Sequence, residues 1–269
     1  MDFFRHFLLA VQFFTRIPVT GRLAAWVGYS PQMLQRCAAH FPAIGWLMGA
    51  AAAAMLAAAL ALLGAQPFAP LVAAVLASIT TVWLTGGFHE DGLADTCDGL
   101  GGGATREKAL HIMKDSRIGS YGTLALVLAL TLKVSLLALL ASRSTNGIGA
   151  GAAALLGAHV LSRTAPLAQM YGMAYVGEAD GSKSKPVVAE ALPARSVAAG
   201  LLWAAPAVVL LGAVHGWGAA TAALLALLAA LAYMTRLVQR RLQGFTGDTL
   251  GALQQVGELA VYLGLAVGA

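Results

Sequence analysis

The sequence predicts an all-α membrane protein, a polytopic bundle of about seven transmembrane helices preceded by an interfacial or re-entrant helix. Of the 269 residues, 59% are hydrophobic and only 11% are charged, whereas soluble proteins average roughly 45–50% apolar and about 25% charged residues. Apolar blocks of about 20 residues recur along the chain, and that length crosses a hydrocarbon core of roughly 30 Å. These observations exclude a soluble enzyme, a disordered chain and a coiled coil. We expect one integral membrane domain over residues 1–269.

The expected elements follow one another along the chain. Residues 3–19 are apolar but contain two arginines and a histidine, which favours an interfacial or re-entrant helix over a signal peptide. Very short segments, at 66–67 and 215–216, separate two pairs of spans and predict tight antiparallel hairpins. The expected spans lie at about 41–65, 68–88, 120–141, 147–170, 196–214, 217–233 and 249–268.

The basic residues predict the orientation of the bundle. In the seven-span arrangement 14 of the 17 Lys and Arg residues fall on one side, only Arg143 falls on the other, and Lys133 and Arg163 lie within spans. The positive-inside rule makes the basic side cytoplasmic, with the N-terminus inside. It also accounts for the net charge of +5, so membrane lipid is the expected partner and nucleic acid is not. The 14 residues are Arg5, Arg16, Arg22, Arg36, Arg106, Lys108, Lys114, Arg117, Lys183, Lys185, Arg195, Arg236, Arg240 and Arg241.

Acidic residues are concentrated in one segment, residues 86–122, on the predicted cytoplasmic side. Six of the 12 Asp and Glu residues lie between positions 90 and 115. Asp91, Asp95 and Asp98 have i, i+4, i+7 spacing, which places three carboxylates on one face of a helix. Since Mg²⁺ prefers one or two carboxylates together with substrate phosphates, this face predicts a magnesium site. The simpler alternative is a solvated acidic loop.

Other polar residues are candidates for the same chemistry. Lys114 and Arg117 could clamp phosphate oxygens beside a carboxylate site, although alone they are typical positive-inside anchors. Arg163 lies within a span, four residues after His159, and we expect either a functional role or snorkelling to the cytoplasmic end. His89 adjoins the acidic residues and could be a general base or a structural residue.

The last span carries a candidate second acidic face. Asp248, Gln255 and Glu258 have i, i+7, i+10 spacing. Asp248 could instead be only an N-cap. Glu258 lies deeper, where an unpaired carboxylate is costly, so it needs a metal, a cation or a proton. Lys133, in the third span, is expected to form a buried ion pair or to snorkel.

Seven short motifs are distributed over essentially the whole chain. They are FTRIPV at 14–19, FPAIG at 41–45, TGGFH at 85–89, DGLADTCDG at 91–99, DSRIG at 115–119, SR at 162–163 and TGDTLGA at 246–252. Together they resemble the adenosylcobinamide-GDP ribazoletransferase family, also called the cobalamin-5′-phosphate synthases. Glu90 stands where this family is expected to have an apolar residue, so we assign it no shared role.

The resemblance implies a multi-pass enzyme of the bacterial inner membrane with a cytoplasmic active site. Such an enzyme joins α-ribazole, or its 5′-phosphate, to adenosylcobinamide-GDP and releases GMP in a Mg²⁺-dependent reaction, the last assembly step of the cobalamin nucleotide loop. A homo-oligomer, and contact with other cobalamin-assembly enzymes, would fit this role. The implied site residues are Asp91, Asp95, Asp98 and Asp115 for the metal, Asp91, Asp95, Asp98 and His89 for catalysis, Lys114, Arg117 and Arg163 for phosphate, and Asp248 and Glu258 to complete the metal site or orient a substrate.

Two other classes of protein stay open. A phospholipid synthase of the CDP-alcohol phosphotransferase type also uses a membrane aspartate cluster, in the frame D-x2-DG-x2-AR-x8-G-x3-D-x3-D. In this chain Asp91-Gly92 precedes Asp95 and no Ala-Arg follows. A cation transporter would favour carboxylates near the midplane of several spans and inverted repeats, whereas the carboxylates here lie at the predicted cytoplasmic boundary.

Overall fold

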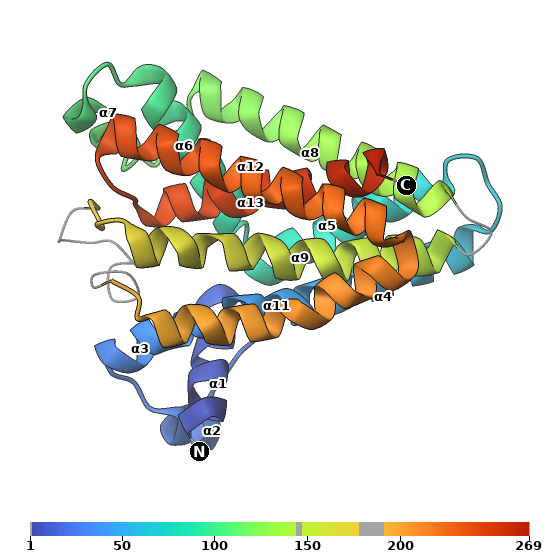
Figure 1. The fold of residues 1–269 in the computed structure, drawn as a ribbon, viewed down its shortest axis with the longest axis horizontal. Coiled ribbons are helices and arrows are strands. Elements are labelled where there is room, and N and C mark those ends of the chain that lie inside the picture. Colours follow the sequence, from blue (N-terminus) through green and yellow to red (C-terminus); the bar gives the residue numbers. More distant parts are fainter. Residues whose placement is uncertain (1, 144–146, 178–190, 269) are drawn as a thin grey trace.

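The computed structural model describes residues 2–143, 147–177 and 191–268, and these residues form a bundle of helices without a β-strand. The longest helices run side by side along the long axis of the molecule (Figure 1). The all-α prediction is therefore confirmed. The helices are α1 (Asp2–Phe14), α2 (Gly21–Val27), α3 (Pro31–Cys37), a 3₁₀ turn (Ala38–His40), α4 (Phe41–Leu63), α5 (Ala69–Thr85), α6 (Phe88–Gly102), α7 (Arg106–Ile112), α8 (Ser120–Ser142), α9 (Gly147–Gly172), α11 (Ala194–His215), α12 (Trp217–Leu242) and α13 (Gly247–Val267).

The membrane spans agree approximately with the seven that the sequence predicts. Among the described residues, five helical segments are long and apolar enough to cross a membrane, and α5 with α6 makes a sixth if this bent pair is one span. The remaining predicted span is α9, which is 26 residues long. Polar residues such as His159 and Arg163 lower its mean hydropathy, so that α9 is not among the five. The chain is a multi-pass membrane protein.

The core of the bundle consists mainly of small side chains. Ala52 in α4, Ala158 in α9, Ala223 in α12 and Ala252 in α13 are all fully buried. Small residues let neighbouring helices approach closely, which is how membrane helices gain packing energy. Large apolar side chains such as Leu202 point outward instead, with 76% of the residue exposed. The outer surface is thus suited to lipid.

The N-terminal helix α1 packs at the side of the bundle (Figure 1). It has 13 residues, too few to cross a hydrocarbon core of about 30 Å, and it buries Leu9, Val11 and Phe14 against its neighbours. Phe3 and Phe4 are exposed at its start. The predicted helix at 3–19 therefore exists and ends at Phe14, before Pro18.

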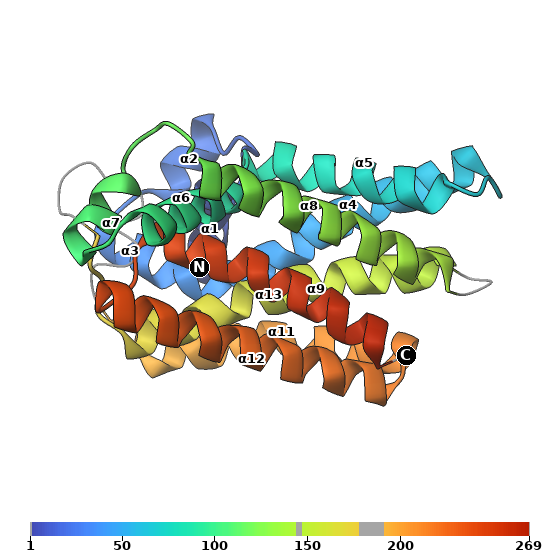
Figure 2. The ribbon, with the colours of Figure 1, turned by 90° about the horizontal axis from the view of Figure 1, so that it is seen from above.

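Two distant segments meet at the end of the bundle that carries α6 and α7 (Figure 2). The Arg106 Nε atom donates a hydrogen bond to the Leu242 carbonyl at 2.7 Å, and Arg241 donates to the Gly103 carbonyl at 2.6 Å. Both arginines belong to the predicted basic side, and this end of the bundle brings them together. Arg143 approaches the Leu265 carbonyl near the C-terminal end of α13. Lys183 and Lys185, which also support the orientation, lie outside the described residues.

Candidate active site

Two consecutive glycines turn the chain sharply where the acidic segment begins. Gly86 and Gly87 have φ angles of 72° and 71°, in the left-handed region that glycine adopts at little cost. As a result α6 leaves α5 at an angle of 89°. With 15 residues and this direction, α6 is not itself a span but lies across the bundle, where it packs on α8 and α13.

The crossing of α6 and α13 brings a distant aspartate to the acidic segment. At Gly92 an added Cβ atom would lie 2.7 Å from the backbone oxygen of Asp248 and 3.1 Å from its Cα atom. Glycine at this position therefore permits the two helix backbones to approach closely. Burial, followed by the charges of Asp91 and Asp248, raises the pKa of Asp95 to about 7. Asp248 therefore lies close enough to interact electrostatically with Asp91 and Asp95.

Asp91 and Asp95 line a large cavity, which we call the acidic cavity. Its volume is about 770 Å³, within the range of roughly 300–1,000 Å³ that is usual for small-molecule sites. The end of α1, the turn between α5 and α6, α6 itself and the segment before α8 form its walls. Its polar lining residues are Gln12, Thr15, Arg16, Thr85, Asp91, Asp95 and Ser116.

Asp98 has a different environment from the other two aspartates of α6. Its carboxylate accepts hydrogen bonds from the backbone N–H groups of Gly119, at 2.7 Å, and Gly122, at 2.8 Å. Gly119 is the N-cap residue of α8 and Gly122 lies in its first turn, where N–H groups have no partner within their own helix. Asp98 is buried and caps α8, so the three carboxylates on one helical face divide into two that line the cavity and one that holds a neighbouring helix.

The predicted phosphate clamp lies on the surface. Arg117 forms an ion pair with Asp115, with Nη2 and Oδ2 2.6 Å apart, and its side chain is 86% exposed. The hydrogen bonds from Arg117 lower the pKa of Asp115 to about 2. Lys114 is also exposed. Of this segment, Ser116 and Ile118 line the acidic cavity, whereas these three charged residues do not.

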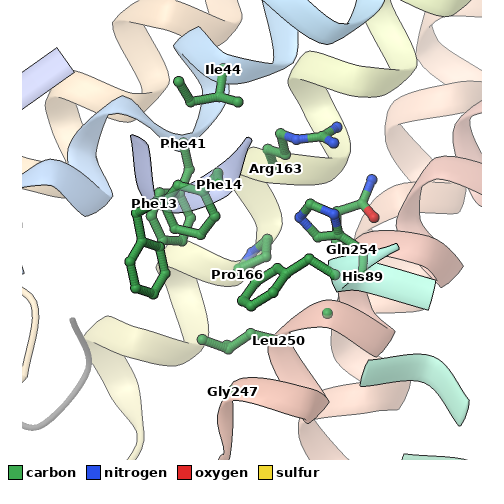
Figure 3. A pocket seen from close by; sticks show the side chains of 12 residues that line it. Phe13, Phe14, Phe41, Ile44, His89, Arg163, Pro166, Gly247, Leu250 and Gln254 are labelled. Carbon is green, nitrogen blue, oxygen red and sulfur yellow. The ribbon is translucent and has the colours of Figure 1, made fainter. Parts of the chain in front are cut away.

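His89 and Arg163 line a second, smaller cavity beside the first (Figure 3). Its volume is about 30 Å³, enough room for water, and phenylalanines from α1, α4 and α6 form much of its wall. Phe13 and Phe88 line both cavities. Arg163 is buried rather than snorkelling, and donates to the ring nitrogen and the backbone oxygen of His159. Its Nε atom has no hydrogen-bond partner among the described residues.

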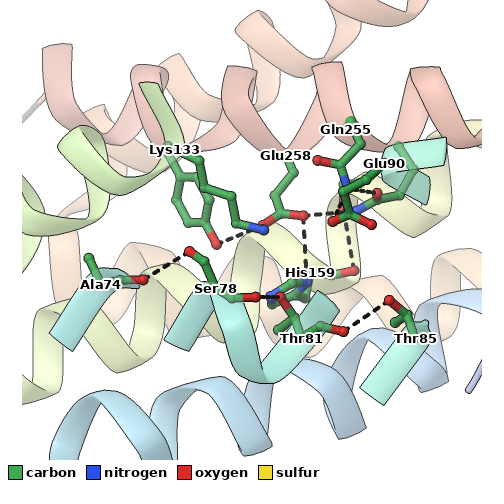
Figure 4. Close-up of polar contacts among 12 residues, drawn as sticks. Ala74, Ser78, Thr81, Thr85, Glu90, Lys133, His159, Gln255 and Glu258 are labelled. Carbon is green, nitrogen blue, oxygen red and sulfur yellow. Dashed lines mark hydrogen bonds and ion pairs between the residues drawn. The ribbon is translucent and has the colours of Figure 1, made fainter. Parts of the chain in front are cut away.

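Glu258 belongs to a separate group of side chains inside the bundle, which we call the interior polar cluster (Figure 4). Its carboxylate pairs with Lys133 at 2.7 Å. It also accepts hydrogen bonds from Gln254, at 2.9 Å, and Tyr262, at 3.1 Å. The need of Glu258 for a cation is therefore met by Lys133, and the buried ion pair predicted for Lys133 is confirmed. The members of this cluster are Lys133, His159, Ser162, Gln254, Glu258 and Tyr262.

Sequence reasoning missed the hydrogen bonds that join α6 to the interior polar cluster. Glu90, to which we assigned no role, is buried and accepts a hydrogen bond from Gln255 at 3.0 Å. The same amide group of Gln255 donates to Gln254, which donates to Glu258. Two adjacent glutamines in an apolar span were the available signal. Arg16 was assigned to the topology of the chain and belongs to the motif FTRIPV, and neither observation indicates that it lines the acidic cavity.

The carboxylates near the acidic cavity can supply only part of a metal site. No group of three or more His, Cys, Asp or Glu side chains in the described part of the chain could hold a metal ion by itself. Mg²⁺ needs fewer protein ligands than this, because it retains waters and binds substrate phosphates together with one or two carboxylates. Asp91 and Asp95, with Asp248 beside them, fit that share of the ligands. The metal assignments of Asp91, Asp95, Asp98 and Asp115 all stay predictions.

Comparison with known proteins decides the family. The sequence model described as cobalamin-5-phosphate synthase matches residues 6–266. The chain belongs to the cobalamin-5-phosphate synthase family. Among its curated relatives, the adenosylcobinamide-GDP ribazoletransferase of Polaromonas naphthalenivorans (strain CJ2) is 53% identical, with 99% of each chain covered. That of Shewanella amazonensis (strain ATCC BAA-1098 / SB2B) is 46% identical over 96% of this chain and 93% of the relative. No solved structure matches the chain.

Membership of the cobalamin-5-phosphate synthase family makes the chain a membrane enzyme of cobalamin biosynthesis, as the motifs indicated. It favours this class over the phospholipid synthase and the cation transporter. Family membership does not by itself assign roles to residues. For those roles the acidic cavity, with its two carboxylates, is the arrangement best suited to chemistry on a diphosphate.

Proposed function

We propose that this chain joins α-ribazole, or its 5′-phosphate, to adenosylcobinamide-GDP and releases GMP in a Mg²⁺-dependent reaction at the acidic cavity. The observation that carries the proposal is the pair Asp91 and Asp95 in a cavity of ligand size. Full-length relatives named adenosylcobinamide-GDP ribazoletransferase support the choice of substrates. The excess of basic residues on one side supports a cytoplasmic site in a bacterial inner membrane.

In this proposal Asp91 and Asp95, together with Asp248, would hold Mg²⁺, which would orient the diphosphate. Bound Mg²⁺ would offset the negative charge that the phosphate oxygens carry in the transition state. A hydroxyl oxygen of ribazole forms a bond to the cobinamide-side phosphorus. The bond between this phosphorus and the bridging oxygen breaks, and GMP leaves with the electron pair.

The proton of the attacking hydroxyl needs an acceptor near the diphosphate. The sequence left this role open between a carboxylate and His89. Asp91 and Asp95 line the acidic cavity, whereas His89 lines the second, smaller cavity. A carboxylate oxygen of the acidic cavity is therefore the better placed acceptor. His89 would then have a structural role, through the contact of its ring with the ring of Phe88.

The test uses the full chain purified in lipid nanodiscs with adenosylcobinamide-GDP, MgCl₂ and either α-ribazole or its 5′-phosphate. We expect equal amounts of GMP and a corrinoid product. Chelation with EDTA should stop the reaction, and added Mg²⁺ should restore it. Comparing the two nucleophiles determines which is preferred. No GMP with either nucleophile would refute the proposed activity, and turnover in EDTA would refute the metal requirement.

A further inference from the structure

Arg16 is the cation of the acidic cavity. Among the described residues that line this cavity, it is the one positively charged side chain, and Asp91 and Asp95 share the cavity with it. The residue is exposed. Within the described parts of the chain its guanidinium has no hydrogen bond or ion pair. The cavity therefore contains both signs of charge, and they are not paired with each other.

The backbone on both sides of Arg16 is held in place. The Thr15 hydroxyl donates to the Val11 carbonyl at 2.7 Å and accepts from the Ile17 N–H at 3.1 Å. The Arg16 N–H donates to the Leu84 carbonyl at 2.7 Å, which ties this segment to the end of α5. An added Cβ atom at Gly86 would lie 3.0 Å from the guanidinium carbon. The glycine turn that directs α6 thus also leaves room for the arginine.

The unpaired charges specify the chemistry of the ligand. The two carboxylates would repel a free anion, and a free cation would leave the guanidinium without an anionic partner. A diphosphate that carries Mg²⁺ satisfies both, because the metal binds the carboxylates while the remaining phosphate oxygens accept hydrogen bonds from the arginine. Arg117 does not fit this role, since it is paired with Asp115 and lies outside the cavity.

We propose that Arg16 binds the diphosphate of the nucleotide-activated substrate, a role for which the sequence suggested Lys114, Arg117 and Arg163. This inference rests on the proposed function and adds to it the residue that recognises the phosphate group. Arg16 also borders an apolar groove on the outside of the bundle, which contains Ile79 and Trp83. A phospholipid headgroup presents the same phosphate chemistry, so the experiment distinguishes the two sources.

The experiment compares Arg16→Gln and Arg16→Lys with the wild type in nanodiscs of phosphatidylcholine, and repeats it with phosphatidylglycerol added. Arg22→Gln is the matched control, because Arg22 is an exposed arginine of α2 that does not line the cavity. We expect Arg16→Gln to raise the KM for adenosylcobinamide-GDP about 10- to 100-fold, the loss typical of one hydrogen-bonded charge pair. The KM for α-ribazole should change less than about twofold. The KM of Arg16→Lys for adenosylcobinamide-GDP should lie between the values of the wild type and Arg16→Gln, because lysine keeps the positive charge but lacks the forked donors of arginine.

A second measurement does not depend on turnover. Mg-GDP should raise the thermal unfolding midpoint of the wild type and of Arg22→Gln by binding the folded state, and Arg16→Gln should lose most of this rise. An equal change in both KM values together with a lower midpoint without ligand would indicate a structural role and overturn the inference. An effect seen only with phosphatidylglycerol would assign Arg16 to lipid. If the wild type forms no product but Arg16→Gln still loses protection by Mg-GDP, the proposed activity fails and the phosphate site stands.

Discussion

The acidic cavity and the interior polar cluster both gather ionisable side chains, but their charges have different partners. In the interior, Glu258 is surrounded by Lys133, Gln254 and Tyr262, and both members of the ion pair are at most 2% exposed. In the acidic cavity, Asp91 and Asp95 lie beside Asp248 without such partners, and the pKa of Asp95 rises to about 7. A fold gains nothing from repelling carboxylates. The paired charges of the interior polar cluster stabilise the bundle, whereas the unpaired charges of the acidic cavity are available to bind a ligand.

The largest expected effect concerns the interior. Replacing Lys133 with Met should lower the free energy of unfolding by about 3–5 kcal/mol, because the Glu258 carboxylate stays buried without its cation. Thermal unfolding in detergent measures the change. The double variant with Glu258→Leu should lose less than the sum of the two single variants, since the charges are removed together. Additive losses would contradict the ion-pair interpretation.

The next prediction concerns the cavity. Asp91→Asn should reduce GMP release by about 10²–10³-fold, the scale of losing one electrostatic group in a reaction centre, while the unfolding midpoint without Mg²⁺ stays the same or rises. The rise is expected because one of three repelling carboxylates becomes neutral. Glu107→Gln is the matched control, because Glu107 is an exposed acid of α7 outside the cavity. An equal loss of GMP release in Asp91→Asn and Glu107→Gln would show that the carboxylates of the cavity have no special role within the acidic segment.

A smaller effect is expected where α6 crosses α13. Gly92→Ala places a methyl group against the backbone of Asp248, which should separate the helices and lower stability by about 1–3 kcal/mol. Turnover should fall by more than the loss of folded protein explains, because Asp248 moves away from Asp91 and Asp95. Gly102→Ala is the control, since its added methyl would meet only the Ile112 side chain, at 3.3 Å. Wild-type turnover in Gly92→Ala would show that the crossing does not position the site.

The smallest effect is expected at Asp98. Asp98→Ala should lower the free energy of unfolding by about 1–2 kcal/mol, the usual cost of losing a helix cap, with the loss measured by chemical or thermal unfolding. Asp98→Asn keeps an acceptor oxygen and should lose less. If Asp98→Asn abolished turnover without loss of stability, Asp98 would be a metal ligand as well as a cap, and the division of α6 between cavity and cap would need revision.

Much of the fold could be predicted from the sequence because span length and apolar composition are local properties. The tight hairpins at 66–67 and 215–216 correspond to the turns between α4 and α5 and between α11 and α12. The i, i+4, i+7 spacing correctly placed three aspartates on one helix. The angle of that helix could not be predicted, since it depends on the backbone conformation of two glycines and on what packs against them.

By itself the sequence determined a multi-pass helical bundle, an acidic segment at one place in it and the family to which it belongs. Only the tertiary structure decided which charges meet. It placed Asp248 beside Asp91 and Asp95, Asp98 at the start of α8, Glu258 with Lys133, and Arg16 in the acidic cavity. The physical reason is that spacing specifies the face of one helix, whereas a shared site depends on where helices cross, and close packing of residues distant in the chain sets those crossings.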